Sequence, residues 1–136
     1  MITAIDTSVL LDVFGADADF GTRSLEALRS ATRDGRLTAC EVVWAEVTVF
    51  FTSAQAARAA MDRLGVEFDP MTVDAATRAG AAWRRYRERG GRRERVVSDF
   101  LIGAHAIAQA ERLLTRDRGF YRSYFSQLRL TDPASS

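Results

Sequence analysis

The sequence predicts one α/β domain with a mainly parallel central sheet of about four to five strands and helices on both faces. Short apolar segments of strand length alternate with longer segments whose apolar residues recur at helical spacing, a pattern typical of such sheets. A chain of 136 residues with 47% hydrophobic side chains also fills one core and is too short for two ordinary domains. We expect the domain to span residues 1–132, followed by a short tail at 133–136.

The first third of the chain predicts two strands and three helices. ITAI at 2–5 is an apolar run of strand length, and TSVLLDVF directly after it has the spacing of a short helix. A longer amphipathic helix is expected at about 20–33, and a short strand at 37–40. EVVWAEVTVFF, residues 41–51, predicts the third helix.

Turn and capping residues delimit the next elements. A helix is expected over 53–64, and the strand VEFDP at 66–70 is stopped by its proline. Thr72 has the hydroxyl of an N-cap residue, so it begins a long helix that we expect to end near Arg89, before two glycines.

The last third of the chain predicts two helices and two strands. Ser98 is the expected N-cap of a helix at 99–110, which is followed by the strand RLLT at 112–115. GFYRSYF at 119–125 predicts a short helix, and LRLT at 128–131 predicts the final strand.

Three aspartates stand where the predicted strands end or a helix begins. Asp6 directly follows the first strand, Asp117 is the second residue after the strand at 112–115, and Asp99 follows Ser98. In open α/β sheets the reactive groups gather beyond the carboxyl ends of the strands. Each aspartate alone is also explained as a helix cap, but together they predict carboxylates that converge on one edge of the sheet.

Glu46 lies in the middle of a predicted helix, where it cannot act as a cap. Its neighbours three and four positions away are Val42, Val43, Val49 and Phe50, so we expect its carboxylate on an apolar stripe. Burying an ionised carboxylate alone is very costly. It therefore requires either an arginine partner or a divalent metal shared with the three aspartates, and Mg²⁺ or Mn²⁺ is the better fit to carboxylate oxygens.

Asp117 is flanked by Arg116 and Arg118 in the segment LLTRDRGF. A surface ion pair would explain this arrangement and would contribute about 0–1 kcal/mol. A site that holds a cation and an anion together explains it as well, because the arginines would meet phosphate oxygens or brace the acids when no substrate is bound.

Positive charge is concentrated in residues 78–95, which hold eight arginines and two glutamates although the net charge of the chain is only +1. A solvated helix face with Arg–Glu pairs explains the helical half of this stretch. The loop after it, with Arg92, Arg93 and Arg95, is the expected contact with an RNA backbone, because arginines that neutralise phosphates dominate nucleic-acid affinity.

Residues that the chain lacks exclude several phosphate chemistries. All nineteen basic residues are arginine, which excludes a P-loop ATPase, a response-regulator receiver and a haloacid-dehalogenase-type phosphatase, since each needs a lysine. The last class also needs an aspartate where Ser8 stands. A two-histidine ribonuclease cannot be built from His105 alone, which we expect to be structural, as is Cys40.

The motifs IDTSVLLDVF, WAEVTVFF, SDFLIGAHA and LLTRDRGFYRSYF have the order and spacing of PIN domains, and the whole chain resembles the VapC toxins of bacterial toxin–antitoxin pairs. The resemblance implies a Mg²⁺ or Mn²⁺ site in which the acids Asp6, Glu46, Asp99 and Asp117 bind the ion, supported by Thr7 and Thr115. It implies a metal-dependent endoribonuclease in which an activated water attacks the phosphodiester, leaving 5′-phosphate and 3′-hydroxyl ends.

The same resemblance implies two protein partners: a VapB-type antitoxin that covers the acids, and a second copy of the chain in a homodimer. Apolar residues near Phe14, Phe20, Phe50 and Phe51 would suit an antitoxin groove. Two alternatives remain, a nuclease that acts on DNA and an interaction module defined mainly by its antitoxin complex. Since no apolar run approaches the roughly 20 residues of a membrane span and no signal peptide is apparent, we expect a cytoplasmic protein.

Overall fold

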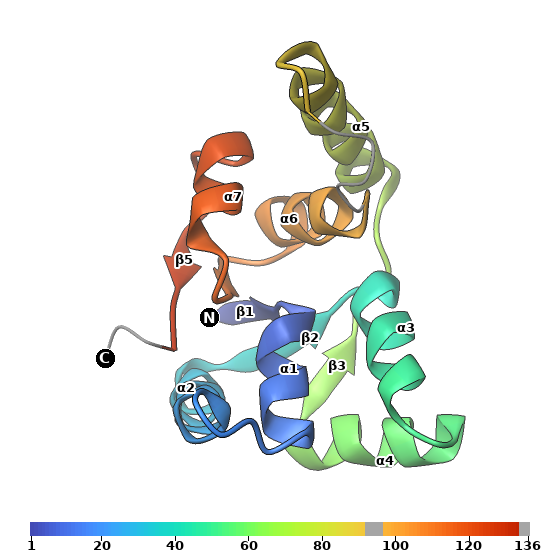
Figure 1. Cartoon of the computed structure of the whole chain (residues 1–136), viewed down its shortest axis with the longest axis vertical. Helices are drawn as coiled ribbons and strands as arrows, with labels where there is room; N and C mark the ends of the chain where they lie inside the picture. Colours follow the sequence, from blue (N-terminus) through green and yellow to red (C-terminus); the bar gives the residue numbers. More distant parts are fainter. Residues whose placement is uncertain (92–96, 134–136) are drawn as a thin grey trace.

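The computed structural model describes residues 1–91 and 97–133, which form a five-stranded parallel sheet with helices on both sides (Figure 1). The strands in chain order are β1 (Ile2–Ile5), β2 (Arg36–Ala39), β3 (Val66–Phe68), β4 (Arg112–Leu114) and β5 (Leu130–Thr131). Their order across the sheet is β3-β2-β1-β4-β5, and every neighbouring pair is parallel. The predicted α/β class and strand number are confirmed.

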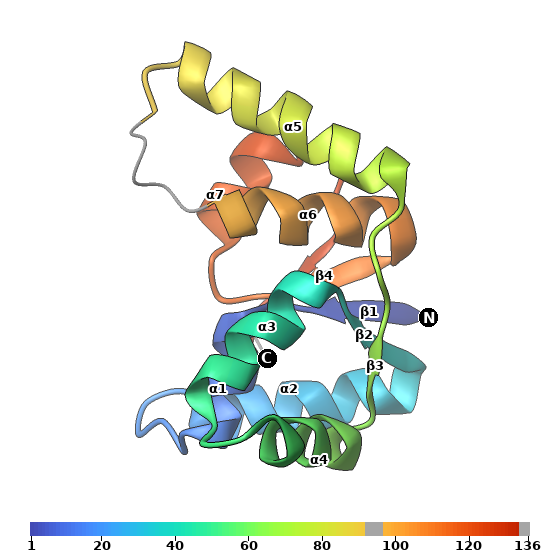
Figure 2. The same ribbon diagram turned by 90° about the vertical axis from the view of Figure 1, so that its right-hand side faces the viewer.

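Seven helices cover this sheet in the described parts of the chain. They are α1 (Thr7–Phe14), α2 (Gly21–Asp34), α3 (Glu41–Phe50), α4 (Ala54–Leu64), α5 (Val73–Glu88), α6 (Val97–Gln109) and α7 (Arg118–Tyr124). Helices α1, α2 and α4 lie on one side of the sheet and α5, α6 and α7 on the other, as the two views in Figures 1 and 2 show. Helix α3 packs on α1 and also reaches α6.

The direction in which the chain adds strands reverses between β1 and β4. The first three strands run outward from the centre of the sheet, and the chain then returns across it to place β4 on the other side of β1. In parallel sheets this reversal leaves a crevice at the carboxyl ends of the two central strands, where ligands bind. The fold therefore marks the ends of β1 and β4, at Ile5 and Leu114, as the place for a site.

Capping residues fix several of the predicted helix ends. The Ser53 hydroxyl accepts a hydrogen bond from the Ala56 backbone N–H at 3.1 Å, and the predicted cap Thr72 accepts one from Ala75 at 3.2 Å. Gly65 ends α4 in the left-handed conformation, with φ of 74°, which a residue without a Cβ adopts freely.

Two predicted boundaries were wrong. Helix α6 already includes Val97, so Ser98 lies inside its first turn and does not precede it as an N-cap. Strand β5 is confined to Leu130–Thr131, because pairing with β4 extends only over Leu113 and Leu114. Of the predicted tail at 133–136, only Pro133 belongs to the described residues, so the domain boundary stays a prediction.

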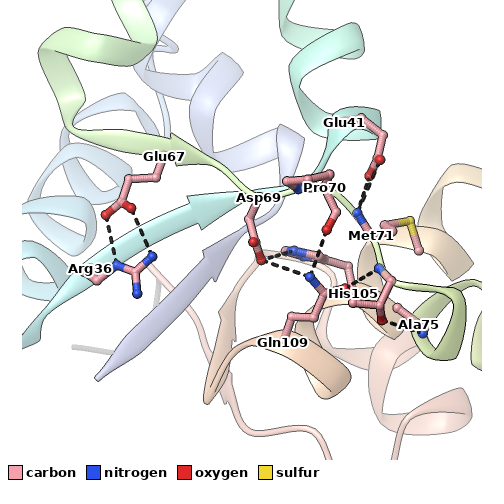
Figure 3. A network of polar contacts seen from close by, with 10 residues as sticks. Arg36, Glu41, Glu67, Asp69, Pro70, Met71, Ala75, His105 and Gln109 are labelled. Atoms are coloured by element: carbon pink, nitrogen blue, oxygen red, sulfur yellow. Dashed lines mark hydrogen bonds and ion pairs between the residues drawn. The ribbon is translucent and has the colours of Figure 1, made fainter.

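A buried histidine fastens the connection after β3 to helix α6 (Figure 3). His105 is 1% exposed, and its Nε2 lies 2.8 Å from the Asp69 carboxylate. Gln109, one turn further along α6, donates to the same carboxylate at 3.2 Å and to the Pro70 carbonyl at 2.9 Å. His105 therefore has the structural role expected of it.

We predict that Asp69→Ala destabilises the protein by about 1–3 kcal/mol, because it leaves the buried His105 nitrogen without its partner. Asp74→Ala is the matched control: it removes an exposed carboxylate that pairs with Arg78 on the surface of α5, worth at most about 0.5 kcal/mol. Urea unfolding of both variants measures the difference. Equal losses of stability would contradict the proposed role of His105.

Candidate active site at the carboxyl edge of the sheet

The ends of β1 and β4 are joined by a short chain of hydrogen bonds that carries two of the predicted acids. The Thr115 hydroxyl donates to Asp6 Oδ2 at 2.7 Å, and the Asp117 backbone N–H donates to the same hydroxyl at 2.9 Å. The Asp6 backbone N–H also continues the strand ladder to the Leu114 carbonyl at 3.0 Å. Residues 109 positions apart are thereby held together at the crevice between the two central strands.

Glu46 reaches the same edge from helix α3. Its Oε1 accepts a hydrogen bond of 2.7 Å from the hydroxyl of Thr7, the residue after Asp6. The predicted apolar stripe around Glu46 was only partly right, because Val43 is buried whereas Val49 is 85% exposed. Glu46 is accordingly half-buried at the margin of the core, and its partner here is a hydroxyl.

Asp99 lies in the first turn of α6 and is half-buried. Its charge acts on Asp6 and on the phenol of Tyr121, and the charge of the exposed Asp117 acts on that phenol too. The four predicted acids therefore come to the same end of the sheet from four different elements. They are buried to very different degrees, since only Asp6 is nearly inaccessible, at 6% exposure.

Burial raises the pKa of Asp6 from its ordinary value of 3.8 to about 6. The hydrogen bond from Thr115 favours the charged form and lowers the pKa, whereas the nearby Asp99 charge raises it further. Desolvation thus disfavours the ionised form of Asp6. A cation beside the carboxylate would favour that form.

The donor groups at this edge match a hard divalent cation, since they are carboxylates with hydroxyls beside them. In residues 1–91 and 97–133, however, no three acid, histidine or cysteine side chains are grouped closely enough to hold an ion. Mg²⁺ retains several waters and takes one or two carboxylates directly, so the chemistry fits such an ion. The set of ligands remains a prediction.

An ion pair between a buried aspartate and a more exposed arginine, which the sequence analysis missed, fixes the loop after β4. Arg116 donates two hydrogen bonds to the Asp12 carboxylate, at 2.7 and 2.9 Å, and Asp12 also accepts one from Ser24 at 2.8 Å. The Arg116 guanidinium lies over the Phe20 ring, 4.2 Å from its centroid. Arg116 thus braces the segment that carries Asp117. The available signal was an aspartate, Asp12, in an otherwise apolar helix.

Of the other arginines predicted to bind RNA, the structure describes only Arg118. Arg118 pairs with Asp132 at 3.0 Å, which ties the start of α7 to the end of β5. Arg92, Arg93 and Arg95 lie outside the described residues. On α5, the Arg87 guanidinium lies 5.9 Å from the exposed ring of Trp83, and Arg85 donates to the Tyr124 carbonyl at 2.9 Å.

The fold and this edge define the class of protein: a parallel α/β domain whose carboxylates gather at the reversal point of the sheet. The PIN domain family matches residues 3–126, and the chain belongs to that family. No curated protein sequence matches it.

Solved structures with the same fold cover nearly the whole chain. One is VapBC2 from Rickettsia felis, bound to a DNA fragment from its promoter, with 20% identity, a TM-score of 0.71, and coverage of 97% of this chain and 98% of that one. Another is VapBC-1 from nontypeable Haemophilus influenzae, with 15% identity, a TM-score of 0.72, and coverage of 99% and 100%.

A third similar structure is VapC20 of Mycobacterium tuberculosis, a toxin that cleaves the sarcin-ricin loop. It shares 21% identity with a TM-score of 0.63, over 93% of this chain and 98% of that one. At these identities the likeness shows a shared fold. Among the described helices, none is long and apolar enough to cross a membrane.

We predict that Asp6→Asn stabilises the metal-free protein by about 1–3 kcal/mol at pH 8, because it removes a buried charge and keeps an oxygen that can accept from Thr115. The pKa of Asp6 is higher in the folded protein than in the unfolded chain, so the wild-type penalty is complete above about pH 6 and absent below about pH 4. The advantage of the variant should therefore vanish as the pH falls through this range.

Thermal unfolding at a series of pH values, with a chelator present, measures this prediction. Asp62→Asn is the matched control, since it makes the same chemical change at an exposed position on α4. A stabilisation by Asp6→Asn that stayed constant from pH 4 to pH 8 would contradict the account, because the buried charge would then not be its source.

We predict that Arg116→Ala costs about 3 kcal/mol of stability, because it leaves the buried Asp12 carboxylate with Ser24 alone. Adding Asp12→Ala to it should cost much less than the sum of the two single changes, since the pair acts as a unit. Arg122→Ala, at an exposed arginine of α7, is the control. If Arg116→Ala kept full stability and lowered only the maximal cleavage rate, the arginine would act on the substrate instead.

Proposed function

We propose that this protein is a Mg²⁺- or Mn²⁺-dependent endoribonuclease that hydrolyses RNA phosphodiesters and acts as the toxin of a toxin–antitoxin pair. The observation that carries the proposal is the hydrogen-bonded series Asp6–Thr115–Asp117 at the reversal point of a PIN-domain sheet. Membership of the family and the gathering of Glu46 and Asp99 at the same edge support it.

In this proposal the four acids bind the ion, and two threonine hydroxyls orient two of the acids by hydrogen bonds. Asp6, Glu46, Asp99 and Asp117 bind the ion directly or through its waters, and Thr7 and Thr115 fix the carboxylates of Glu46 and Asp6 by the hydrogen bonds that they donate. When bound, the ion supplies a nucleophilic water at neutral pH and stabilises the charge on the leaving oxygen. No side chain of the protein needs to form a covalent bond with the substrate.

In the proposal, some arginines near the acids stabilise the site and others bind the RNA. Arg116, braced against Asp12, keeps the loop of Asp117 in place, and Arg118 adds positive charge beside it. Arg92, Arg93 and Arg95 connect α5 to the acid-bearing α6 in the sequence, and we propose that they bind the phosphates of the RNA backbone. The basic end of α5 lies on the same side of the molecule as the start of α1 (Figure 2).

RNA is preferred to DNA as the proposed substrate because one protein of the same fold, VapC20, cleaves the sarcin-ricin loop. We further propose that the protein acts in the cytoplasm, forms a homodimer and is inhibited by a VapB-type antitoxin. Proteins with this fold have been solved as toxin–antitoxin complexes, including one from Klebsiella pneumoniae. Phe50 is 48% exposed and packs edge-on against Phe51, next to Phe14, which provides apolar surface for such a partner.

We predict that Asp6→Asn, Glu46→Gln and Asp99→Asn each abolish cleavage while the protein stays folded, because metal binding requires the charge and the position of each acid. Cleavage of a labelled single-stranded RNA with added Mn²⁺ is the measurement, and Asp62→Asn is the control that should keep wild-type activity. Wild-type rates in two of the three variants would show that the proposed site is wrong.

The same assay separates RNA from DNA as substrate. Single-stranded RNA and duplex DNA are offered together to the wild-type protein, and preferential loss of the DNA would favour a DNA nuclease. Sequencing the ends of cellular RNA after controlled expression would then identify the RNA that is cut.

We predict that replacing Arg92, Arg93 and Arg95 together by alanine weakens RNA binding and lowers the salt dependence of the affinity by about one unit of slope for each lost phosphate contact. Cleavage at saturating RNA should persist. The matched control replaces three exposed arginines on α2 and α4, Arg29, Arg58 and Arg63, and changes the net charge equally. If both triple variants changed the slope equally, the effect would be one of net charge and the loop would not be the RNA contact.

A further inference from the structure

The side chain of Tyr121 on α7 is buried in the core together with its polar hydroxyl. It is 1% exposed and is the largest of the fully buried side chains in the described chain. Its hydroxyl is also buried, and among the described residues that hydroxyl has no hydrogen-bond partner. Buried hydroxyls are almost always paired, and an unpaired one costs stability that a phenylalanine would not. Packing in the core therefore does not account for the presence of a hydroxyl at this position.

The surroundings of the hydroxyl are the acids of the proposed site. Burial raises the pKa of Tyr121 above its ordinary value, and the charges of Asp6, Asp99 and Asp117 raise it further. The phenol is therefore a proton donor at every physiological pH. It lies near enough to Asp6 to lower the pKa of that carboxyl, although its geometry falls short of a formed hydrogen bond.

The ring of Tyr121 is held in place from several sides. It packs edge-on against Phe120, with ring centroids 5.2 Å apart, and lies 6.5 Å from the ring of Phe125. Phe125 in turn rests directly on Gly103 of α6, where an added Cβ would come within 2.5 Å of the phenyl ring. The fit of α7 onto α6 thus holds the ring of Tyr121 in place, with its hydroxyl close enough to Asp6 for the two groups to interact.

We propose that Tyr121 is a positioning residue of the acid site, whose hydroxyl donates a hydrogen bond to Asp6 when a divalent cation is bound. Asp6 would then be held between two hydroxyls, those of Thr115 and Tyr121, with the orientation that the ion requires. This inference rests on the proposed function, since it assigns a partner to one of the proposed ligands.

The test is Tyr121→Phe, with Tyr124→Phe as the matched control. The control makes the same change one turn along α7, on a ring that packs against Phe100 and Tyr86. Mn²⁺ binding is followed by the electron paramagnetic resonance of the free ion, and unfolding is measured with a chelator present. Cleavage is measured as a function of Mn²⁺ concentration.

For Tyr121→Phe we expect a 10- to 100-fold weaker Mn²⁺ affinity, by analogy with other residues that orient metal ligands. The metal-free variant should be at least as stable as the wild type, because no formed hydrogen bond is lost. Cleavage should recover at saturating Mn²⁺. Tyr124→Phe should bind Mn²⁺ as the wild type does.

Two results would overturn the inference while the proposed function stood. One is wild-type Mn²⁺ affinity in Tyr121→Phe, and the other is a loss of metal-free stability as large as the loss of affinity, which would indicate a structural role only. If the wild-type protein itself failed to bind Mn²⁺, the proposed function would be wrong and this inference with it.

Discussion

The hydrogen bond from Thr115 to Asp6 is the contact on which the site depends, because it joins the ends of the two strands where the sheet reverses direction. Asp6 is buried by the core that β1 and α1 build around it, and burial disfavours its charge. A hydroxyl donor offsets part of that penalty and leaves the carboxylate available to a cation. The rest of the penalty appears as the rise in the pKa of Asp6 to about 6.

Around this contact, the helices on the two faces each supply a different part of the edge. From one face, α3 brings Glu46 to Thr7 and α1 brings Asp12 to Arg116. From the other face, α6 carries Asp99 and α7 carries Tyr121. The candidate site therefore lies where the helices of the two layers meet at the end of the sheet, and its carboxylates come from separate elements.

The sequence predicted the architecture well because periodicity and strand-ending acids are local signals. Asp6 and Asp117 could be placed at one edge because parallel strands bring their carboxyl ends together. Pairings between distant side chains have no such signal. Nothing local links Asp12 to Arg116, and Tyr121 has the spacing of an ordinary core residue. The environment of Glu46 was misjudged because helical spacing identifies a stripe but not how far the next layer covers it, and Val49 is left uncovered.

The separation of the site residues along the chain has a consequence for synthesis. Asp6 is made 109 residues before its partner Thr115, and the helix of Tyr121 follows later still. Because contacts of such long range form only after the loops between them close, a growing chain carries Asp6 without the hydroxyls that would orient it. The acid edge can be completed only after α7 has been synthesised. A nuclease built in this way cannot become competent while its message is read only as far as the residues before β4 and α7.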